Sequence, residues 1–189
     1  MNKIIYIESD IKDHLRTKLI CSSFNKPEVV IIDRFSEIFN KRNQSFKIQK
    51  TNPALILAKK YKNLFHKTPD NYGIGNKHNY YFSYMYNCLF DCKYCFLQGM
   101  YSSANYVIFV NYEDYYKEIK KISAANKDKR ITLFSGYDCD SLAFEPVSNF
   151  MAYLIKKLSK YRNIDLEIRT KSTYSRLFSN KIIKNVIIA

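Results

Sequence analysis

The sequence predicts an α/β protein in two parts, a small β-α-β-α domain over residues 1–72 and a parallel sheet or barrel over residues 73–189. Short apolar runs alternate along the chain with segments whose apolar residues recur at helical spacing, and such alternation implies parallel strands joined by helices. The chain has 47% hydrophobic residues with only four glycines and four prolines. It can therefore bury a core, and it does not resemble a disordered or low-complexity protein.

The N-terminal part contains two predicted strands and two predicted helices. Ile4–Glu8 and Val29–Ile32 are short apolar runs typical of buried parallel strands. Between them, Ile11–Ser23 keeps helical spacing, and Asp10 is the expected cap of this helix. A short helix is expected over Arg34–Asn40.

A polar connection over residues 41–50 leads to a compact apolar segment at residues 53–58. Residues 68–77 then hold half of the chain's glycines and clear turn chemistry. We place the domain boundary in this stretch.

The C-terminal part repeats strand, loop and helix. Strands are expected over Tyr80–Tyr86, Ile131–Ser135, Leu166–Ile168 and Val186–Ala189, and helices over Tyr112–Asn126, Glu145–Tyr161 and Tyr174–Asn180. In folds of this kind, functional residues lie on loops at the carboxyl ends of strands. Three loops meet this condition: the cysteine-rich loop that begins at Asn87, Gly136–Ser141 and Arg169–Ser172.

Cys88, Cys92 and Cys95 form the pattern C-x3-C-x2-C, which suits three corners of a cubane iron-sulfur cluster. Such clusters need soft thiolate ligands, and a cubane normally takes four of them. Three cysteines therefore leave one iron open, and an open iron can chelate the amino and carboxylate groups of S-adenosyl-L-methionine. This pattern is the signature of radical S-adenosylmethionine enzymes.

The chain resembles the spore photoproduct lyase family of radical S-adenosylmethionine proteins, often labelled DNA repair photolyases. The resemblance is carried by Tyr6–Glu8, Gln49–Lys50, Leu55–Ala58, Tyr80–Phe82, Asn87–Gln98, Asp138–Leu142 and Arg169–Ser172. It implies a partial (β/α) TIM-type barrel of the radical S-adenosylmethionine kind, incomplete here, after the small N-terminal domain.

The resemblance also implies cofactors, chemistry and partners. Cys88, Cys92 and Cys95 are expected to hold a [4Fe-4S] cluster that cleaves S-adenosyl-L-methionine reductively to a 5′-deoxyadenosyl radical. In the lyase, this radical reverses a methylene-bridged thymine dimer. DNA is therefore an expected partner, together with an electron donor such as flavodoxin or ferredoxin.

Five further residues receive roles from the resemblance. Tyr94 and Phe96 are expected against the adenosine of the cofactor, and packing at the barrel mouth is the alternative. Ser141 and Lys171 are expected to contact the sugar and the methionine carboxylate, and for Lys171 the alternative is a solvated surface lysine. Cys139 is a candidate hydrogen donor to the product radical, unless the match shifts by two or three residues and places it opposite the cofactor-binding serine.

Two departures from the family pattern stand out. The lyase has tyrosine on both sides of the third cysteine, and here Phe96 takes the position whose phenol is implicated in relaying the radical. The sequence also stops at Ala189, inside the predicted fourth strand of the barrel. We therefore expect a truncated or inactive family member, or a product that needs a partner segment.

Two other classes of protein stay open at this stage. Zinc could replace the cluster with Cys139 or His78 as a fourth ligand, although only Cys92 and Cys95 form the C-x2-C spacing that zinc sites usually pair. A zinc- or cluster-stabilised nucleic-acid-binding protein would also suit the net charge of +14. That charge is spread evenly along the chain. It comes mostly from lysine, and an AT-rich genome would produce the same excess of lysine without selection for nucleic-acid binding.

The compartment is predicted from the cysteines and the apolar runs. Five cysteines, three of them crowded together, do not suit a disulfide framework and favour a reducing compartment. Cys21 lies on an apolar helical face and is expected in the core. Since no apolar run approaches the ~18 residues of a membrane span and the start lacks a signal peptide's apolar stretch, we expect a cytoplasmic protein with no membrane partner.

Overall fold

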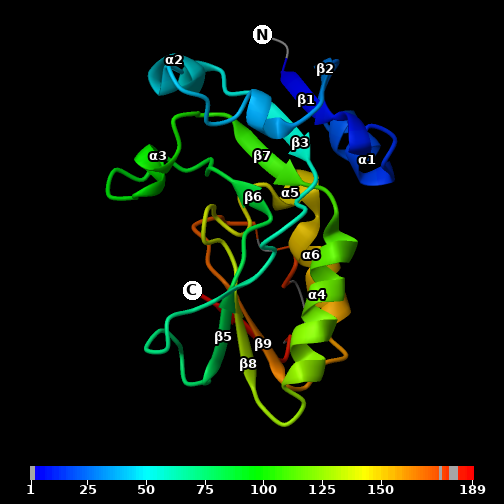
Figure 1. Cartoon of the computed structure of the whole chain (residues 1–189), viewed down its shortest axis with the longest axis vertical. Helices are drawn as coiled ribbons and strands as arrows, with labels where there is room; N and C mark the ends of the chain where they lie inside the picture. Colours follow the sequence, from blue (N-terminus) through cyan, green and yellow to red (C-terminus); the bar gives the residue numbers. More distant parts are fainter. Residues whose placement is uncertain (1–2, 175, 179–182) are drawn as a thin grey trace. The chain divides into compact units, whose positions relative to one another are not determined.

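The computed structural model of the chain describes residues 3–174, 176–178 and 183–189 (Figure 1). These residues form a mixed α/β fold with two five-stranded sheets, and neither sheet closes into a barrel within the described residues. The predicted α/β class with parallel strands is confirmed. No described helix is both long enough and apolar enough to cross a membrane.

The chain divides into two compact units, Met1–Lys60 with Met85–Val110 and Tyr61–Tyr84 with Asn111–Ala189. Each sheet lies within one unit. The first unit is discontinuous because residues 85–110 return to the first sheet as its last two strands. The predicted division into domains at residues 1–72 and 73–189 stays a prediction.

The first unit holds a sheet with the order β2-β1-β3-β7-β6. Its strands are β1 (Ile4–Glu8), β2 (Glu28–Ile32), β3 (Leu55–Ala58), β6 (Met85–Tyr86) and β7 (Tyr106–Phe109). All neighbours pair in parallel except β6 and β7, which are antiparallel. The connections contain α1 (Leu15–Ser22), α2 (Phe46–Thr51), α3 (Leu97–Met100) and 3-10 turns at Ser9–Ile11 and Phe35–Glu37.

The second unit holds a sheet with the order β10-β9-β8-β5-β4. Its strands are β4 (His66–Lys67), β5 (His78–Tyr81), β8 (Ile131–Phe134), β9 (Ile164–Ile168) and β10 (Val186–Ile188). Only β4 and β5 pair antiparallel among the described strands of this sheet. The helices are α4 (Tyr112–Ala125), α5 (Glu145–Ser148) and α6 (Phe150–Leu158), and α4 lies beside α6 (Figure 1).

The first predicted helix begins later than expected. The predicted strands at β1 and β2 are confirmed, but the helix predicted over residues 11–23 starts only at Leu15. His14 caps it, because its Nδ1 atom accepts the backbone N–H of Arg16 at 3.2 Å. Asp10, the predicted cap, lies in the preceding 3-10 turn. Cys21 is half-buried rather than fully in the core, and burial raises the pKa of its thiol.

Helical structure in the next segment is also shifted along the chain. The helix predicted over residues 34–40 is a single 3-10 turn, and the predicted polar connection over residues 41–50 contains α2 instead. Ser45 caps α2, because its hydroxyl accepts the backbone N–H of Ile48 at 3.4 Å. The compact apolar segment at residues 53–58, for which no element is predicted, contains strand β3.

The single strand predicted over residues 80–86 is wrong, because β5 and β6 belong to different sheets. The segment between them is buried, and its backbone polar groups pair outside a common ladder. Phe82 donates its N–H to the carbonyl of Phe134 at 3.0 Å, and the carbonyl of Ser83 accepts the phenol of Tyr115 at 2.8 Å. These backbone groups of the segment thus have hydrogen-bond partners although the segment is not one continuous strand.

The helix predicted over residues 145–161 is broken at Asn149, which has a left-handed φ of 52°. A buried carboxylate explains the break, because Glu145 accepts the N–H groups of Met151 at 2.9 Å and Ala152 at 2.8 Å and so caps α6. Helix α4 and strands β8, β9 and β10 match their predictions. The helix predicted over Tyr174–Asn180 falls partly on residues 175, 179 and 180, which lie outside the described residues.

The core of the second unit is built on Phe150. Its ring stacks on Tyr84 at a centroid distance of 4.3 Å and meets Tyr112 and Tyr115 edge-on at 4.7 and 5.3 Å. All four side chains are buried, and each tyrosine hydroxyl donates a hydrogen bond to a backbone carbonyl. The cluster therefore buries large apolar area without leaving a phenol unsatisfied.

We expect Phe150→Ala to lower the free energy of unfolding by about 3–5 kcal/mol, because it removes the ring that three tyrosines contact. Urea unfolding measures this loss. Lys156→Ala, an exposed change on the same helix, is the control and should stay within about 0.5 kcal/mol of the wild type. Equal effects of the two changes would contradict the assignment of Phe150 to the core.

Glu145 should make stability depend on pH. Burial raises its pKa to about 7, while the N–H donors of Ala152 and Met151 act in the opposite direction. Below the ordinary value of 4.5, both the folded and the unfolded states are protonated and this contribution is fully present. As the pH rises toward about 7, the unfolded state ionises first, so the contribution is lost.

The comparison with Glu145→Gln isolates this group. We expect the unfolding free energy of the wild type minus that of the variant to fall by about 3 kcal/mol between about pH 4 and about pH 8. Urea unfolding of both proteins at several pH values measures it. A difference that does not change with pH would show that Glu145 has an ordinary pKa.

Candidate functional site

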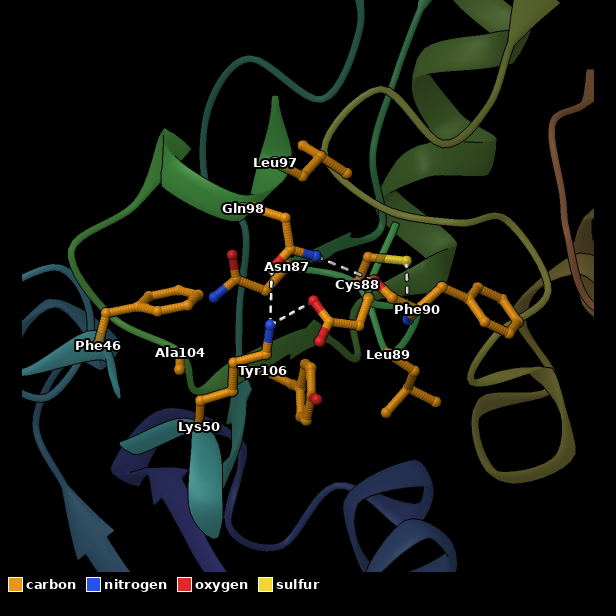
Figure 2. A pocket seen from close by; sticks show the side chains of 11 residues that line it. Phe46, Lys50, Asn87, Cys88, Leu89, Phe90, Leu97, Gln98, Ala104 and Tyr106 are labelled. Atoms are coloured by element: carbon orange, nitrogen blue, oxygen red, sulfur yellow. Dashed lines mark hydrogen bonds and ion pairs between the residues drawn. The ribbon is translucent and has the colours of Figure 1, made fainter. Parts of the chain in front are cut away.

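The three cysteines of the predicted cluster motif lie on one long loop, residues 87–105, which joins β6 to β7 in the first unit. Because β6 and β7 pair antiparallel, the two ends of the loop are neighbours in the sheet. Figure 2 shows the first part of this loop beside α2. Both ends of the loop are therefore held in place by the paired strands β6 and β7.

Asn87 closes the base of the loop. It has a left-handed φ of 64°, which asparagine tolerates better than most residues, and its side chain is buried. Its Nδ2 atom donates to the carbonyls of Ser103 and Asn105, both at 2.7 Å. The Oδ1 atom of Asn105 in turn accepts the N–H of Ala54 at 2.9 Å, which ties the loop end to the start of β3.

The three cysteines are partly exposed, and none of the five in the chain forms a disulfide. The Sγ atom of Cys88 accepts the N–H of Phe90 at 3.4 Å, and the N–H of Cys95 donates to the carbonyl of Cys92 at 2.9 Å. An N–H···S bond such as the one from Phe90 to Cys88 is among the contacts that set the reduction potential of an iron-sulfur cluster. Cys92 and Cys95 thus flank one turn, and Cys88 precedes it on the same loop.

No group of three or more His, Cys, Asp or Glu side chains that could hold one metal ion occurs among the described residues. This finding gives no support to a tetrahedral zinc site, in which four ligands converge on one ion. In a cubane, each cysteine binds a different iron, so the sulfurs need not converge on one point. By its donor chemistry, the loop fits an iron-sulfur cluster.

Tyr94 and Phe96, predicted to lie against adenosine, project from the same loop. Their exposed fractions are 80% and 65%, although residues of their size are usually well buried. Both residues flank Cys95 in the sequence, and both side chains are open to solvent. Their role toward a cofactor stays a prediction.

Two consecutive residues of α2 hold the loop from its other side. The Nζ atom of Lys50 lies 2.5 Å from Asp91 Oδ1 and 2.8 Å from Gln98 Oε1 (Figure 2). Gln49 Oε1 accepts the hydroxyl of Ser103 at 3.0 Å and the N–H of Ala104 at 2.8 Å. Sequence reasoning noted Gln49 and Lys50 only as part of a family pattern and missed these contacts, because no local spacing signals them.

A pocket opens between α2 and the cysteine loop, with Lys50, Cys88 and Tyr106 in its lining (Figure 2). Burial raises the pKa of the Tyr106 phenol, and the neighbouring Cys88 and Asp91 raise it further. The Asp91 carboxylate places a negative charge in the lining of this pocket. Lys50 supplies a positive charge there.

The other predicted site residues belong to two loops of the second unit, after β8 and after β9. Gly136 starts the first of them with a φ of 73°, and a Cβ atom there would lie 2.6 Å from Ser141 Oγ. Ser141 is fully buried, and its hydroxyl meets that of Ser135 at 2.6 Å and accepts the N–H of Arg169 at 3.2 Å. The predicted contact of Ser141 with a cofactor would thus have to replace the hydrogen bond to Ser135 or the one from Arg169.

Asp140 joins the two loops. Its Oδ1 atom accepts the hydroxyl of Thr170 at 2.7 Å and the N–H of Leu142 at 2.9 Å, and its Oδ2 atom accepts the N–H of Lys171 at 2.5 Å. Lys171 is exposed on an anchored backbone, whereas Cys139 is 4% exposed. The structure therefore brings Ser141 and Lys171 into one network, whose organising residue sequence reasoning did not single out.

Comparison with known proteins gives a fold and no sequence family. No family model matches the chain, and no curated protein matches it in sequence. A cysteine-to-serine variant of spore photoproduct lyase superposes on the whole chain with a TM-score of 0.81 at 13% identity. The same lyase complexed with dinucleoside spore photoproduct, and a double variant with bound AdoMet and that dinucleoside, each give 0.79 at 13% identity.

The chain covers 55% of the length of these lyase structures. The predicted resemblance to spore photoproduct lyase is confirmed in the fold, since the described part of the chain matches about half of that structure. At this identity, the likeness establishes the fold alone.

The closure of the loop by Asn87 can be tested with two variants. Asn87→Gly keeps the left-handed backbone and removes the amide, so two buried carbonyls lose a donor at a cost of about 1–3 kcal/mol. Asn87→Ala should cost about 1 kcal/mol more, because alanine disfavours this conformation. Urea unfolding gives both values. If Asn87→Gly were as stable as the wild type, the amide would not be what closes the loop.

Proposed function

We propose that this chain is a radical S-adenosylmethionine protein in which the thiolates of Cys88, Cys92 and Cys95 hold a [4Fe-4S] cluster. The single observation that carries the proposal is the cysteine loop itself: three partly exposed thiols on one loop with a fixed base, in a chain with the fold of spore photoproduct lyase. When bound, the cluster supplies the electron that cleaves S-adenosyl-L-methionine to a 5′-deoxyadenosyl radical.

The loop residues between the cysteines support this proposal. Tyr94 offers an exposed aromatic face on which an adenine ring can stack, and Phe96 offers a second apolar surface. The N–H of Phe90 stabilises the Cys88 thiolate by hydrogen bonding. These residues can thereby orient a cofactor and donate a hydrogen bond to a ligand sulfur.

We assign the loops of the second unit to cofactor binding and to hydrogen supply. The exposed ammonium of Lys171 can neutralise a carboxylate, and Asp140 fixes the backbone that carries it. Ser141 fixes the loop through Ser135 and Arg169, and can reach a cofactor only by exchanging one of those bonds. Cys139 is a buried thiol on the same loop, the environment of a hydrogen donor that must be shielded from solvent.

The proposed substrate class is a DNA photolesion. Solved lyase structures of the same fold carry a dinucleoside spore photoproduct, and a net charge of +14 favours binding to a polyanion. Phe96 lacks the phenol that the resemblance assigns to radical relay. We therefore expect either another hydrogen path or a substrate different from the thymine dimer.

Anaerobic reconstitution with iron and sulfide tests the cluster directly. We expect bound iron with acid-labile sulfide, a reduced-cluster signal by electron paramagnetic resonance, and formation of 5′-deoxyadenosine when S-adenosyl-L-methionine and a reductant are added. Cys92→Ala should lose the cluster signal and the product, because it removes one of the three ligands. Cys21→Ala, a cysteine on α1 outside the loop, is the matched control and should retain both.

The outcomes separate the alternatives. Zinc without sulfide would overturn the proposal in favour of a zinc-stabilised protein. A cluster that forms but yields no 5′-deoxyadenosine would support cluster binding and contradict turnover by this chain. Retention of the cluster in Cys92→Ala would show that the ligands lie elsewhere.

A further inference from the structure

Lys50 is placed to act on the cysteine loop from outside the motif. It lies on α2, whose start is fixed by the Ser45 cap. Its Nζ atom contacts Asp91 Oδ1 at 2.5 Å and Gln98 Oε1 at 2.8 Å (Figure 2). Asp91 precedes Cys92 in the sequence, and Gln98 follows Cys95. One ammonium therefore bonds to the loop on both sides of these two cysteines.

A chain of hydrogen bonds leads from Lys50 to a ligand sulfur. The Oε1 atom of Gln98 accepts from Lys50, and its Nε2 atom donates to the carbonyl of Phe90 at 3.2 Å. The N–H of Phe90 donates to Cys88 Sγ at 3.4 Å. Removing the ammonium therefore takes one of two anchors from the Gln98 side chain, whose other anchor is the carbonyl of the residue that donates to the sulfur.

Global stability does not explain this arrangement. The side chains of Lys50 and Asp91 are 39% and 71% exposed, and ion pairs this exposed contribute about 0–1 kcal/mol. The same contacts matter more locally, because outer residues orient metal ligands and their loss typically costs about 10–100-fold in metal affinity. The position of Lys50 thus fits an effect on the loop rather than on the whole fold.

The charges add a second consequence. Asp91 is adjacent in sequence to Cys92, and a carboxylate beside a cluster opposes the addition of an electron. Lys50 offsets this charge at 2.5 Å. The two members of the pair should therefore shift the reduction potential of a bound cluster in opposite directions.

We propose that Lys50 is a positioning residue for the cluster site: its ammonium clamps Asp91 and Gln98, holds the cysteine loop in its ligand-bearing conformation and neutralises the carboxylate beside Cys92. This inference rests on the proposed cluster-binding function and assigns a role to a residue outside the cysteine motif.

The first test needs no cluster. Hydrogen exchange over residues 88–98 is measured in the metal-free protein for the wild type, Lys50→Met and Lys47→Met. Lys47 is an exposed lysine on the same helix, so its variant loses the same charge without a contact to the loop. We expect exchange in this peptide to rise several-fold in Lys50→Met and to stay at the wild-type rate in Lys47→Met. Equal exchange in the two variants would overturn the clamp.

The second test uses the reconstituted proteins. We expect Lys50→Met to lose iron to a chelator about tenfold faster than Lys47→Met. Its cluster should have a lower midpoint potential than that of the wild type, whereas Asp91→Asn should give a higher one. Lys50→Arg should restore iron retention and potential, since it keeps the charge and the donors. A purely structural role would shift the potentials of Lys50→Met and Asp91→Asn in the same direction and would overturn the electrostatic part of the inference.

Failure of the inference and failure of the proposed function look different. If the wild type and Lys47→Met assemble a cluster and Lys50→Met matches them in both tests, the clamp is wrong and the function stands. If the wild type binds no iron and sulfide, the proposed function falls, and with it the role of Lys50 toward a cluster.

Discussion

The antiparallel pairing of β6 with β7 is the constraint on which the candidate cluster site depends. It places the two ends of an 87–105 loop next to each other in a sheet whose other described strands pair in parallel. Asn87 completes this base, because one amide bonds two carbonyls from the far end of the loop. A cysteine motif on an open connection would lose much more conformational entropy on binding a cluster.

The same physical solution recurs in both units: loops are held by polar side chains that bond to groups distant in sequence. Gln49 and Lys50 do so for the cysteine loop, and Asp140 and Ser141 do so for the loops after β8 and β9. Buried backbone groups outside helices and strands must find partners, and Gln49, Asp140 and Ser141 supply them. The residues that carry candidate chemistry therefore rest on a layer of amides, carboxylates and hydroxyls.

Sequence patterns predicted the regular elements well where one physical signal dominated. Apolar runs located β1, β2, β8, β9 and β10, and helical spacing located α4 to within one residue. Predictions failed where a distant partner decided the outcome. The carboxylate of Glu145 ends one helix and caps the next, and the pairing of Phe82 and Ser83 with residues 134 and 115 divides a run that reads as one strand.

The candidate site divides in the same way between what a sequence can and cannot reveal. The cysteines, and the aromatic residues between and after them, follow from spacing and residue type, whereas the contacts of Lys50 and Asp140 join segments about 30 to 40 residues apart and leave no local periodicity. This difference bears on function. Tyr94 is 80% exposed on a loop whose base and flank are both tied down, so its ring is presented to solvent without the freedom of a flexible loop. Binding on such a prepared surface costs little ordering of the protein. This restraint supports the proposal that one cofactor covers both the exposed ring and the partly exposed thiols.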